Sequence, residues 1–182
     1  MWGGEIPQMI RSLLLLGLLF VPSHTMADLF DQIGPMDGSG IGSGTRASQD
    51  FGSGLDFWDI IAGDNVTITS SMSINGVEMI LKGWGGFTDP SSITNYQLNF
   101  YSTPEQSGSS LIGDIASINI DSADATIIPQ WTSIGYLVSL PVAIELEIGE
   151  HYFGVLPTNQ YSVYGQVGIK ESVIGDGIAG FW

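Results

Sequence analysis

The amino-acid sequence predicts an all-β protein, an antiparallel β-sandwich of the jelly-roll type preceded by a signal-peptide helix. Three observations support this fold class. Short runs rich in β-branched and aromatic residues recur from residue 55 onward, each bounded by glycine, proline, asparagine, aspartate or serine. Several runs alternate apolar and polar residues, as half-buried strands do. Beyond the N-terminal segment, no stretch keeps a helical spacing of apolar residues for more than about two turns.

Residues 1–27 have the three parts of a secretory signal peptide. Arg11 precedes the apolar run Leu13–Val21, and Thr25-Met26-Ala27 places small residues where a signal peptidase reads them. A membrane-spanning helix needs about 20 apolar residues, and this run is less than half that length. We therefore expect a cleavable export signal, a mature chain that is secreted or lies at the cell surface, and no stable membrane span in it.

The mature chain divides by composition into an arm and a domain. Residues 28–54 show little apolar periodicity, and Asp37–Gly44 is rich in glycine, which loses the most entropy on ordering. We expect a glycine-rich N-terminal arm there, followed by the sandwich domain over residues 55–182. The segment Gly177–Trp182 ends on two large apolar residues. This ending favours a chain that is cut short and lacks its last strand.

Nine segments are predicted to form strands in the sandwich domain. They are Leu55–Ile61, Val66–Thr69, Met72–Leu81, Tyr96–Tyr101, Leu111–Ile120, Thr126–Trp131, Tyr136–Ile148, Tyr152–Leu156 and Tyr161–Ile169. In Ile144–Ile148 the apolar residues fall on one face of the strand and the acids on the other. We expect Pro141 to divide the long seventh segment, because proline cannot donate to a sheet ladder.

The charge balance restricts the partners of this protein. The chain has 19 aspartates and glutamates against four lysines and arginines, for a net charge of −15. Nucleic-acid binding depends on basic groups that displace counterions, so we expect no nucleic-acid partner. Such a surface also disfavours anionic lipid. There is no cysteine, which excludes disulfides, thiolate metal sites and a cysteine nucleophile.

A series of short motifs resembles a group of exported bacterial proteins. The motifs, in order, are Ala47–Phe51 (ASQDF), Asp56–Asp59 (DFWD), Val66–Thr69 (VTIT), Ile74–Gly76 (ING), Tyr96–Tyr101 (YQLNFY) and Gly149–Val155 (GEHYFGV). They resemble β-sandwich proteins that often end in a sorting anchor of the PEP-CTERM type. This chain has Trp58-Asp59 where those proteins carry a doubled acid, and it has no anchor. The missing anchor fits either truncation or free secretion.

The resemblance implies an exported β-sandwich of largely unassigned function, often supposed to act at the cell surface or in an extracellular matrix. It supplies no catalytic residues. The sequence motifs also do not indicate a particular chemical reaction. Gly42–Ala47 and Gly175–Gly180 imitate nucleotide-binding loops, but a phosphate site needs a strand before the loop and a helix after it, so we expect two ordinary loops.

Candidate catalytic groups are few. His151 is the single histidine after residue 27, and it is expected to be partly exposed at a strand edge. Glu145 and Glu147 project from one face at a spacing close to that of paired glycosidase carboxylates, although acids on the outer face of a strand need no explanation beyond solvation and edge protection. We keep a carboxylate-based glycoside hydrolase as one alternative and expect no enzyme.

Oxygen ligands for calcium form another alternative. Asp121 and Asp124, with Asp114 nearby, are candidate Ca²⁺ ligands, although no EF-hand loop is present. No other cofactor is indicated, and no other metal ligands are predicted.

Aromatic residues supply the candidate binding site. Trp84 lies among glycines in a predicted loop that leaves little to bury an indole, and Trp131 follows a proline and a glutamine. Exposed aromatic faces on such loops stack on sugar rings. Core packing is the default expectation for Trp58, Tyr152 and also Trp131. The sequence thus predicts a non-catalytic exported sandwich that acts at the surface or in a matrix, with a carbohydrate-binding module as the alternative and polysaccharide or matrix components as partners.

Overall fold

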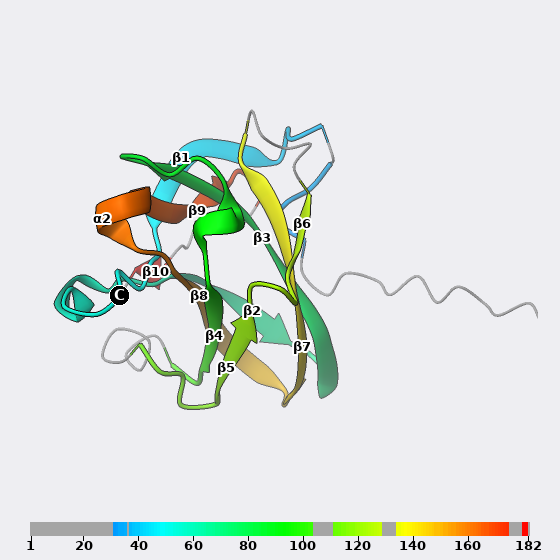
Figure 1. Cartoon of the computed structure of the whole chain (residues 1–182). Coiled ribbons are helices and arrows are strands. Elements are labelled where there is room, and N and C mark those ends of the chain that lie inside the picture. Colours follow the sequence, from blue (N-terminus) through cyan, green and yellow to red (C-terminus); the bar gives the residue numbers. More distant parts are fainter. Residues whose placement is uncertain (1–30, 36, 104–110, 129–133, 175–179, 182) are drawn as a thin grey trace, which may run out of the picture.

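Two five-stranded sheets pack face to face and form the β-sandwich that the sequence predicts (Figure 1). All strand pairs within the sheets are antiparallel. The computed structural model describes residues 31–35, 37–103, 111–128, 134–174 and 180–181. The expected signal peptide lies outside these residues.

The described elements are, in chain order, β1 (Ile41–Ala47), the 3₁₀ helix η1 (Asp56–Trp58), β2 (Ala62–Ile68), β3 (Met72–Trp84), the 3₁₀ helix η2 (Pro90–Ser92), β4 (Asn95–Tyr101), β5 (Ala116–Asp121), β6 (Thr126–Ile128), β7 (Tyr136–Leu146), β8 (Gly149–Thr158), α2 (Tyr161–Tyr164), β9 (Gln166–Ser172) and β10 (Gly180–Phe181). The first sheet has the order β1-β9-β3-β7-β6, and the second has the order β10-β2-β8-β4-β5.

The strand pairing is that of a jelly roll. Strand β1 pairs with β9, β2 with β8, β3 with β7, and β4 with β5. These partners are nested, as if one long antiparallel ribbon had been folded around a barrel, which is the double Greek-key arrangement of this fold. Strands β6 and β10 extend the two sheets beyond these eight strands. The jelly-roll expectation is therefore confirmed.

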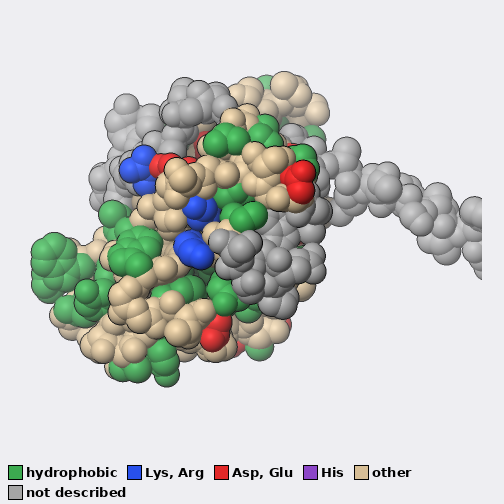
Figure 2. Space-filling view, turned by 90° about the horizontal axis from the view of Figure 1, so that it is seen from above, with side chains coloured by type: hydrophobic (Ala, Val, Ile, Leu, Met, Phe, Trp, Pro, Cys, Tyr) green, Lys and Arg blue, Asp and Glu red, His purple; other side chains and the backbone are tan. Residues whose placement is uncertain are grey.

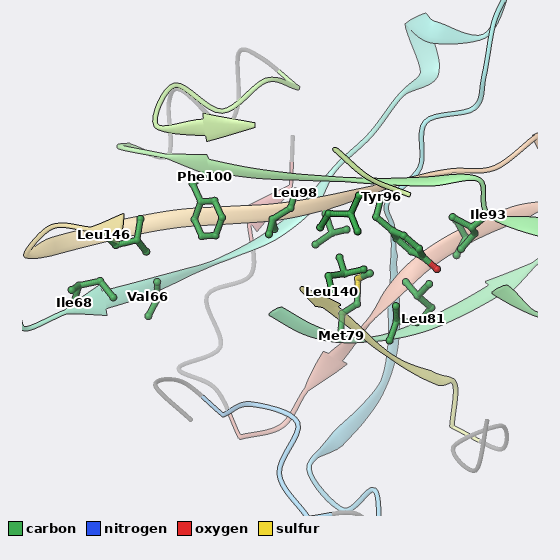
Figure 3. Packing of buried hydrophobic residues seen from close by; sticks show 14 residues of the cluster. Val66, Ile68, Met79, Leu81, Ile93, Tyr96, Leu98, Phe100, Leu140 and Leu146 are labelled. Carbon is green, nitrogen blue, oxygen red and sulfur yellow. The ribbon is translucent and has the colours of Figure 1, made fainter. Parts of the chain in front are cut away.

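Alternation along each strand places apolar side chains between the sheets (Figure 3). In β4, Tyr96, Leu98 and Phe100 point into the core, whereas Asn95 and Gln97 lie on the outer face. A side chain buried in this way stabilises the fold by about 1.5–3 kcal/mol relative to an exposed one. The fully described core consists of Val66, Ile68, Met79, Leu81, Ile93, Tyr96, Leu98, Phe100, Ile120, Val138, Leu140, Leu146, Val155 and Val167.

The glycine-rich segment expected to form an arm instead contributes strand β1 at the edge of the first sheet. Its residues pair with β9, from Thr45 opposite Lys170 to Ala47 opposite Gly168. The loop expected at Gly42–Ala47 is thus a strand. Backbone pairing with β9 satisfies its polar groups, and this stabilisation does not depend on the apolar side chains that the segment lacks.

Three other predicted strands differ from the observed elements. The segment Leu55–Ile61 contains the 3₁₀ helix η1, and Leu111–Ile120 becomes a strand only from Ala116. The segment Tyr161–Ile169 begins with the helical turn α2 before β9 starts at Gln166. Short apolar runs occur both in helical turns and in strands, so the composition of these segments could not distinguish the two structures.

Strand β7 continues through Pro141, contrary to the expected division. The register with β3 shifts between Ile74 and Gly76, opposite Pro141, so a bulge absorbs the proline. On the other side, β6 pairs only from Leu137 to Ser139. The expected strand alternation through Ile148 also stops early, because β7 ends at Leu146 and Ile148 lies in a turn with 68% of its surface exposed.

Two buried polar side chains fix the chain where it crosses from β1 to β2. The Ser48 hydroxyl donates to the Val155 carbonyl and accepts from the Ala62 amide at 3.0 Å. The Gln49 amide nitrogen donates to the Asn159 carbonyl at 2.8 Å, and its oxygen accepts from the Val167 amide at 2.8 Å. Both side chains are fully buried. The Ala47–Phe51 motif therefore has a structural role, since it ties the two sheets together.

Two tyrosines should make the protein sensitive to alkali. The hydroxyls of Tyr96 and Tyr101 are buried without a hydrogen-bond partner among the described residues. Burial raises the pKa of Tyr96, and burial together with the nearby Asp114 carboxylate raises the pKa of Tyr101 to about 12. Above pH of about 10 the unfolded chain loses these protons while the folded chain keeps them, so stability should fall between about pH 10 and 12.

We expect the Tyr96→Phe, Tyr101→Phe protein to show a smaller loss of melting temperature between pH 9 and pH 11 than the parent. Tyr164→Phe, which changes an exposed tyrosine, is the matched control and should melt like the parent at both pH values. An equal alkaline loss in the parent and the double variant would contradict this account.

Candidate functional site

Trp84 ends strand β3 on the outer face of the first sheet. Its neighbour Gly83 lies against Phe87, a partly buried residue that packs on the core. Alternation therefore turns the indole the other way, and 41% of Trp84 is exposed. Gly85 and Gly86 follow with φ angles of 67° and 123°, which only glycine adopts readily. The structure thus confirms that the indole is exposed, although Trp84 belongs to a strand end and not to a loop.

A second pair of exposed aromatic residues lies on η1. Phe57 and Trp58 are 75% and 61% exposed, and their ring centroids are 5.0 Å apart. The expectation that Trp58 lies in the core is wrong. The backbone closes a tight turn there, with the Trp58 amide donating to the Leu55 carbonyl at 2.8 Å, so both rings leave the sheet.

The base of this turn is held in place by buried contacts. The Asp59 carboxylate accepts from the Phe51 amide at 2.9 Å, and the Phe51 ring packs against Tyr161 with centroids 5.4 Å apart. Burial raises the pKa of Asp59, and the carboxylates of Asp50 and Asp56 add to the rise, while the hydrogen bond from Phe51 opposes it. Phe57 and Trp58 therefore project from an anchored support.

The helical turn α2 brings further aromatic side chains to the same end of the sandwich. Tyr161 and Tyr164 are 46% and 43% exposed. The backbone of Tyr164 and Gly165 lies against Gly86, next to Trp84. In Figure 1, α2 and the loop before β2 project from the same side of the molecule. We call the exposed residues Phe57, Trp58, Trp84, Tyr161 and Tyr164 the aromatic end.

Sequence reasoning found one of these residues and missed the others. Trp131, the second candidate, lies outside the described residues. A signal for the η1 pair was present, because Phe57 and Trp58 are adjacent and flanked by Asp56 and Asp59. A strand would bury only one of two adjacent side chains, so at least one ring had to face solvent. Tyr152, expected in the core, is partly buried, and its hydroxyl donates to Glu150 at 2.8 Å.

The structure separates the three candidate calcium ligands. Asp114 precedes β5 and Asp121 ends it, so about 20 Å of extended strand lies between them. Asp121 and Asp124 share a turn in which the Asp124 amide donates to the Asp121 carbonyl at 2.9 Å. Asp114 accepts from the Ser102 hydroxyl and amide, which lowers its pKa. Over the described residues, no three histidines or acids are grouped as for a metal ion.

The two candidate glycosidase carboxylates are exposed and hydrogen-bonded to serines. Glu145 accepts from the Ser73 hydroxyl, and Glu147 accepts from the Ser71 hydroxyl at 2.7 Å. Glu145 belongs to β7, whereas Glu147 lies in the following turn, so strand alternation no longer relates them. The structure places both at the end of the sandwich opposite Trp84, since Met72 at the start of β3 pairs with Leu146.

His151 lies inside the second sheet and not at its edge, contrary to expectation. It pairs with Val66 in β8, which has β2 on one side and β4 on the other, and only 9% of the residue is exposed. Its Nε2 nitrogen donates to the Glu147 carbonyl at 2.8 Å. The imidazole therefore fastens the β7–β8 turn.

Comparisons of the chain with models of known protein families, with curated proteins and with solved structures found no match. In the described part of the chain, no helix has the length and apolar character needed to cross a bilayer. A shallow groove between β5 and β7 is lined by Ile118, Asn119, Ile120, Asp124, Pro141, Val142 and Ala143.

Proposed function

We propose that this chain is a non-catalytic, exported β-sandwich protein of the cell surface or extracellular matrix, and that it acts by binding polysaccharide. The observation that carries the proposal is the aromatic end, where five aromatic side chains stay exposed on three separate segments. Full burial of such a side chain is worth about 1.5–3 kcal/mol, and a ligand that covers the exposed part restores a share of it. Aromatic faces with nearby polar groups suit the apolar faces and hydroxyl rims of sugar rings.

Charge favours a sugar over a lipid surface for these rings. Asp56 and Asp59 flank the Phe57–Trp58 pair. Their carboxylates would repel an anionic membrane from these two rings. Carboxylates and amides, in contrast, accept hydrogen bonds from sugar hydroxyls. The export signal that the sequence predicts at residues 1–27 and the resemblance to exported bacterial proteins support a role outside the cytoplasm, where polysaccharides are abundant.

The arrangement of the candidate catalytic groups supports a role without catalysis. His151 is enclosed in a sheet and engaged with the Glu147 carbonyl. A serine nucleophile needs a base within hydrogen-bond reach, and a buried imidazole in the middle of a sheet does not offer one to a substrate. Glu145 and Glu147 lie at the opposite end from the aromatic residues.

The proposal is tested by affinity electrophoresis in native gels that contain a panel of neutral and anionic polysaccharides. We expect at least one polymer to retard the parent protein. Trp84→Ala, or Phe57→Ala with Trp58→Ala, should weaken that binding by about tenfold or more, as for a central aromatic contact. The matched control is Ile148→Ala, which removes an exposed apolar side chain at the other end of the sandwich.

Unchanged migration of the parent protein in every gel would refute polysaccharide binding. Binding that the Trp84 and Phe57–Trp58 variants retain in full would also refute the proposed surface. The melting temperature of each variant is measured alongside. Because these side chains are exposed, we expect it to stay close to that of the parent.

A further inference from the structure

The basic residues of this acidic protein gather on one sheet. Arg46, Lys82 and Lys170 lie on β1, β3 and β9, which are adjacent strands. Arg11, in the expected signal peptide, is the fourth base of the chain. Figure 2 shows Lys and Arg side chains on one face of the molecule, two of them side by side. In a chain with 19 acids, the described cations thus lie on three adjacent strands.

Strand register puts Lys82, Lys170 and Trp84 on the same outer face. Leu81 and Val167 are buried in the core, so their neighbours on each strand alternate outward. Trp84 follows Lys82 by two residues, which is about 7 Å along the strand. Lys82 pairs with Gly168, and Lys170 lies two residues beyond that glycine on β9. Diagonal neighbours of this kind are about 7–8 Å apart.

Within the described residues, neither lysine forms an ion pair with a carboxylate. An ion pair in this region joins Arg46 to Glu171. Glu171 follows Lys170 directly on β9, so its side chain lies on the other face of that strand. The Lys170 ammonium donates to the Ser43 carbonyl at 2.9 Å. Burial and the nearby Lys82 charge lower the pKa of Lys170, and the Glu171 carboxylate offsets only part of this effect. An anion placed between the two ammonium groups would relieve this repulsion.

We propose that the polysaccharide is built from uronic acids, with a sugar ring stacked on Trp84 and its carboxylate bound by Lys82 and Lys170. This inference rests on the proposed function and specifies its ligand. A uronic acid carries the carboxylate directly on a ring carbon, so a ring held by the indole keeps the charge at its rim. Each lysine side chain is flexible and reaches across a spacing of about 7 Å from its strand.

The test compares two forms of one polymer, polygalacturonate and the same polymer with its carboxyl groups methyl-esterified. Affinity electrophoresis is run at about 150 mM salt, where a Debye length of about 8 Å screens repulsion from the distant acids. We expect polygalacturonate to retard the protein and the ester to retard it less. Lys82→Gln with Lys170→Gln should weaken binding to polygalacturonate about fivefold or more and leave binding to the ester unchanged.

Two variants serve as controls. Arg46→Gln removes one positive charge from the same sheet, as each lysine substitution does. Because Arg46 pairs with Glu171 on the other face, this variant should retain binding to polygalacturonate. Lys82→Arg with Lys170→Arg keeps both charges and should bind like the parent. Melting temperatures show whether each variant is folded.

The outcomes separate this inference from the proposed function. Equal binding of both polymer forms, or full binding by the glutamine variant, would overturn the uronic-acid inference and leave carbohydrate binding in place. Binding of only neutral polymers that depends on Trp84 would overturn it in the same way. If the parent protein bound none of the polymers, both proposals would be refuted. Equal retardation by dextran sulfate, lost in the glutamine variant, would show an anion site without carboxylate preference.

Discussion

Replacing Leu98 with alanine is expected to lower the free energy of unfolding by about 2–5 kcal/mol. Leu98 is fully buried in β4, which lies between β8 and β5 in the second sheet, and it pairs with Val155 of β8 and Ile118 of β5. Truncation removes its transfer energy and leaves a cavity that neighbouring strands, fixed by their ladders, fill only in part. A domain of this size is stable by about 5–15 kcal/mol, so the change is a large part of the total.

Urea unfolding followed by tryptophan fluorescence measures this effect. The control is Ile148→Ala, which removes methyl groups from a residue that is 68% exposed and should change stability by no more than about 0.5 kcal/mol. A Leu98→Ala protein as stable as the control would mean that β4 does not pack between the sheets as described.

Replacing Gln49 with leucine should cost about 2–4 kcal/mol, because it leaves buried backbone groups without partners. The side chain keeps nearly its volume, but the Val167 amide and the Asn159 carbonyl each lose a hydrogen bond of 2.8 Å. Both partners lie on segments that flank α2. We therefore expect the substitution to loosen the attachment of α2 as well as to destabilise the whole domain.

Two measurements distinguish these effects. Urea unfolding gives the global loss, and hydrogen exchange of the Val167 amide reports the local one, since the exchange should accelerate beyond what the global loss explains. Gln160→Leu is the matched control, because Gln160 is exposed and its side chain does not cap α2. A Gln49→Leu protein with parental stability and parental exchange would contradict the assigned cross-link.

The aromatic end and the hydrogen bonds of Gln49 are connected through a short segment of chain. Gln49 holds the segment after β1 to the segment around α2, while Phe51, two residues later, packs on Tyr161. Phe57 and Trp58 then project from the same segment. If the proposed function holds, loss of the Gln49 hydrogen bonds should also weaken ligand binding, because this short segment connects the buried Gln49 to the exposed rings.

Local patterns accounted for the fold class and for much of the strand content. The run Tyr96–Tyr101, rich in aromatic and apolar residues, indicated a strand, and the observed β4 spans Asn95–Tyr101. The glycines around Trp84 indicated an exposed indole, and 41% of it is exposed. These features follow from side-chain period and backbone freedom, which are properties of a few neighbouring residues.

Partners distant along the chain decided the remaining features. Gly42–Ala47 is a strand because β9, more than 100 residues later, offers it a ladder, and His151 is buried because β2 and β4 enclose β8. The meeting of Lys82, Lys170 and Trp84 likewise depends on the register of β3 with β9. The side-chain period of a strand shows on which face a residue lies, but it does not show which strand pairs with it. The composition of the chain therefore predicted an acidic sandwich, whereas only long-range pairing placed two of its lysines on the same sheet face as an exposed tryptophan.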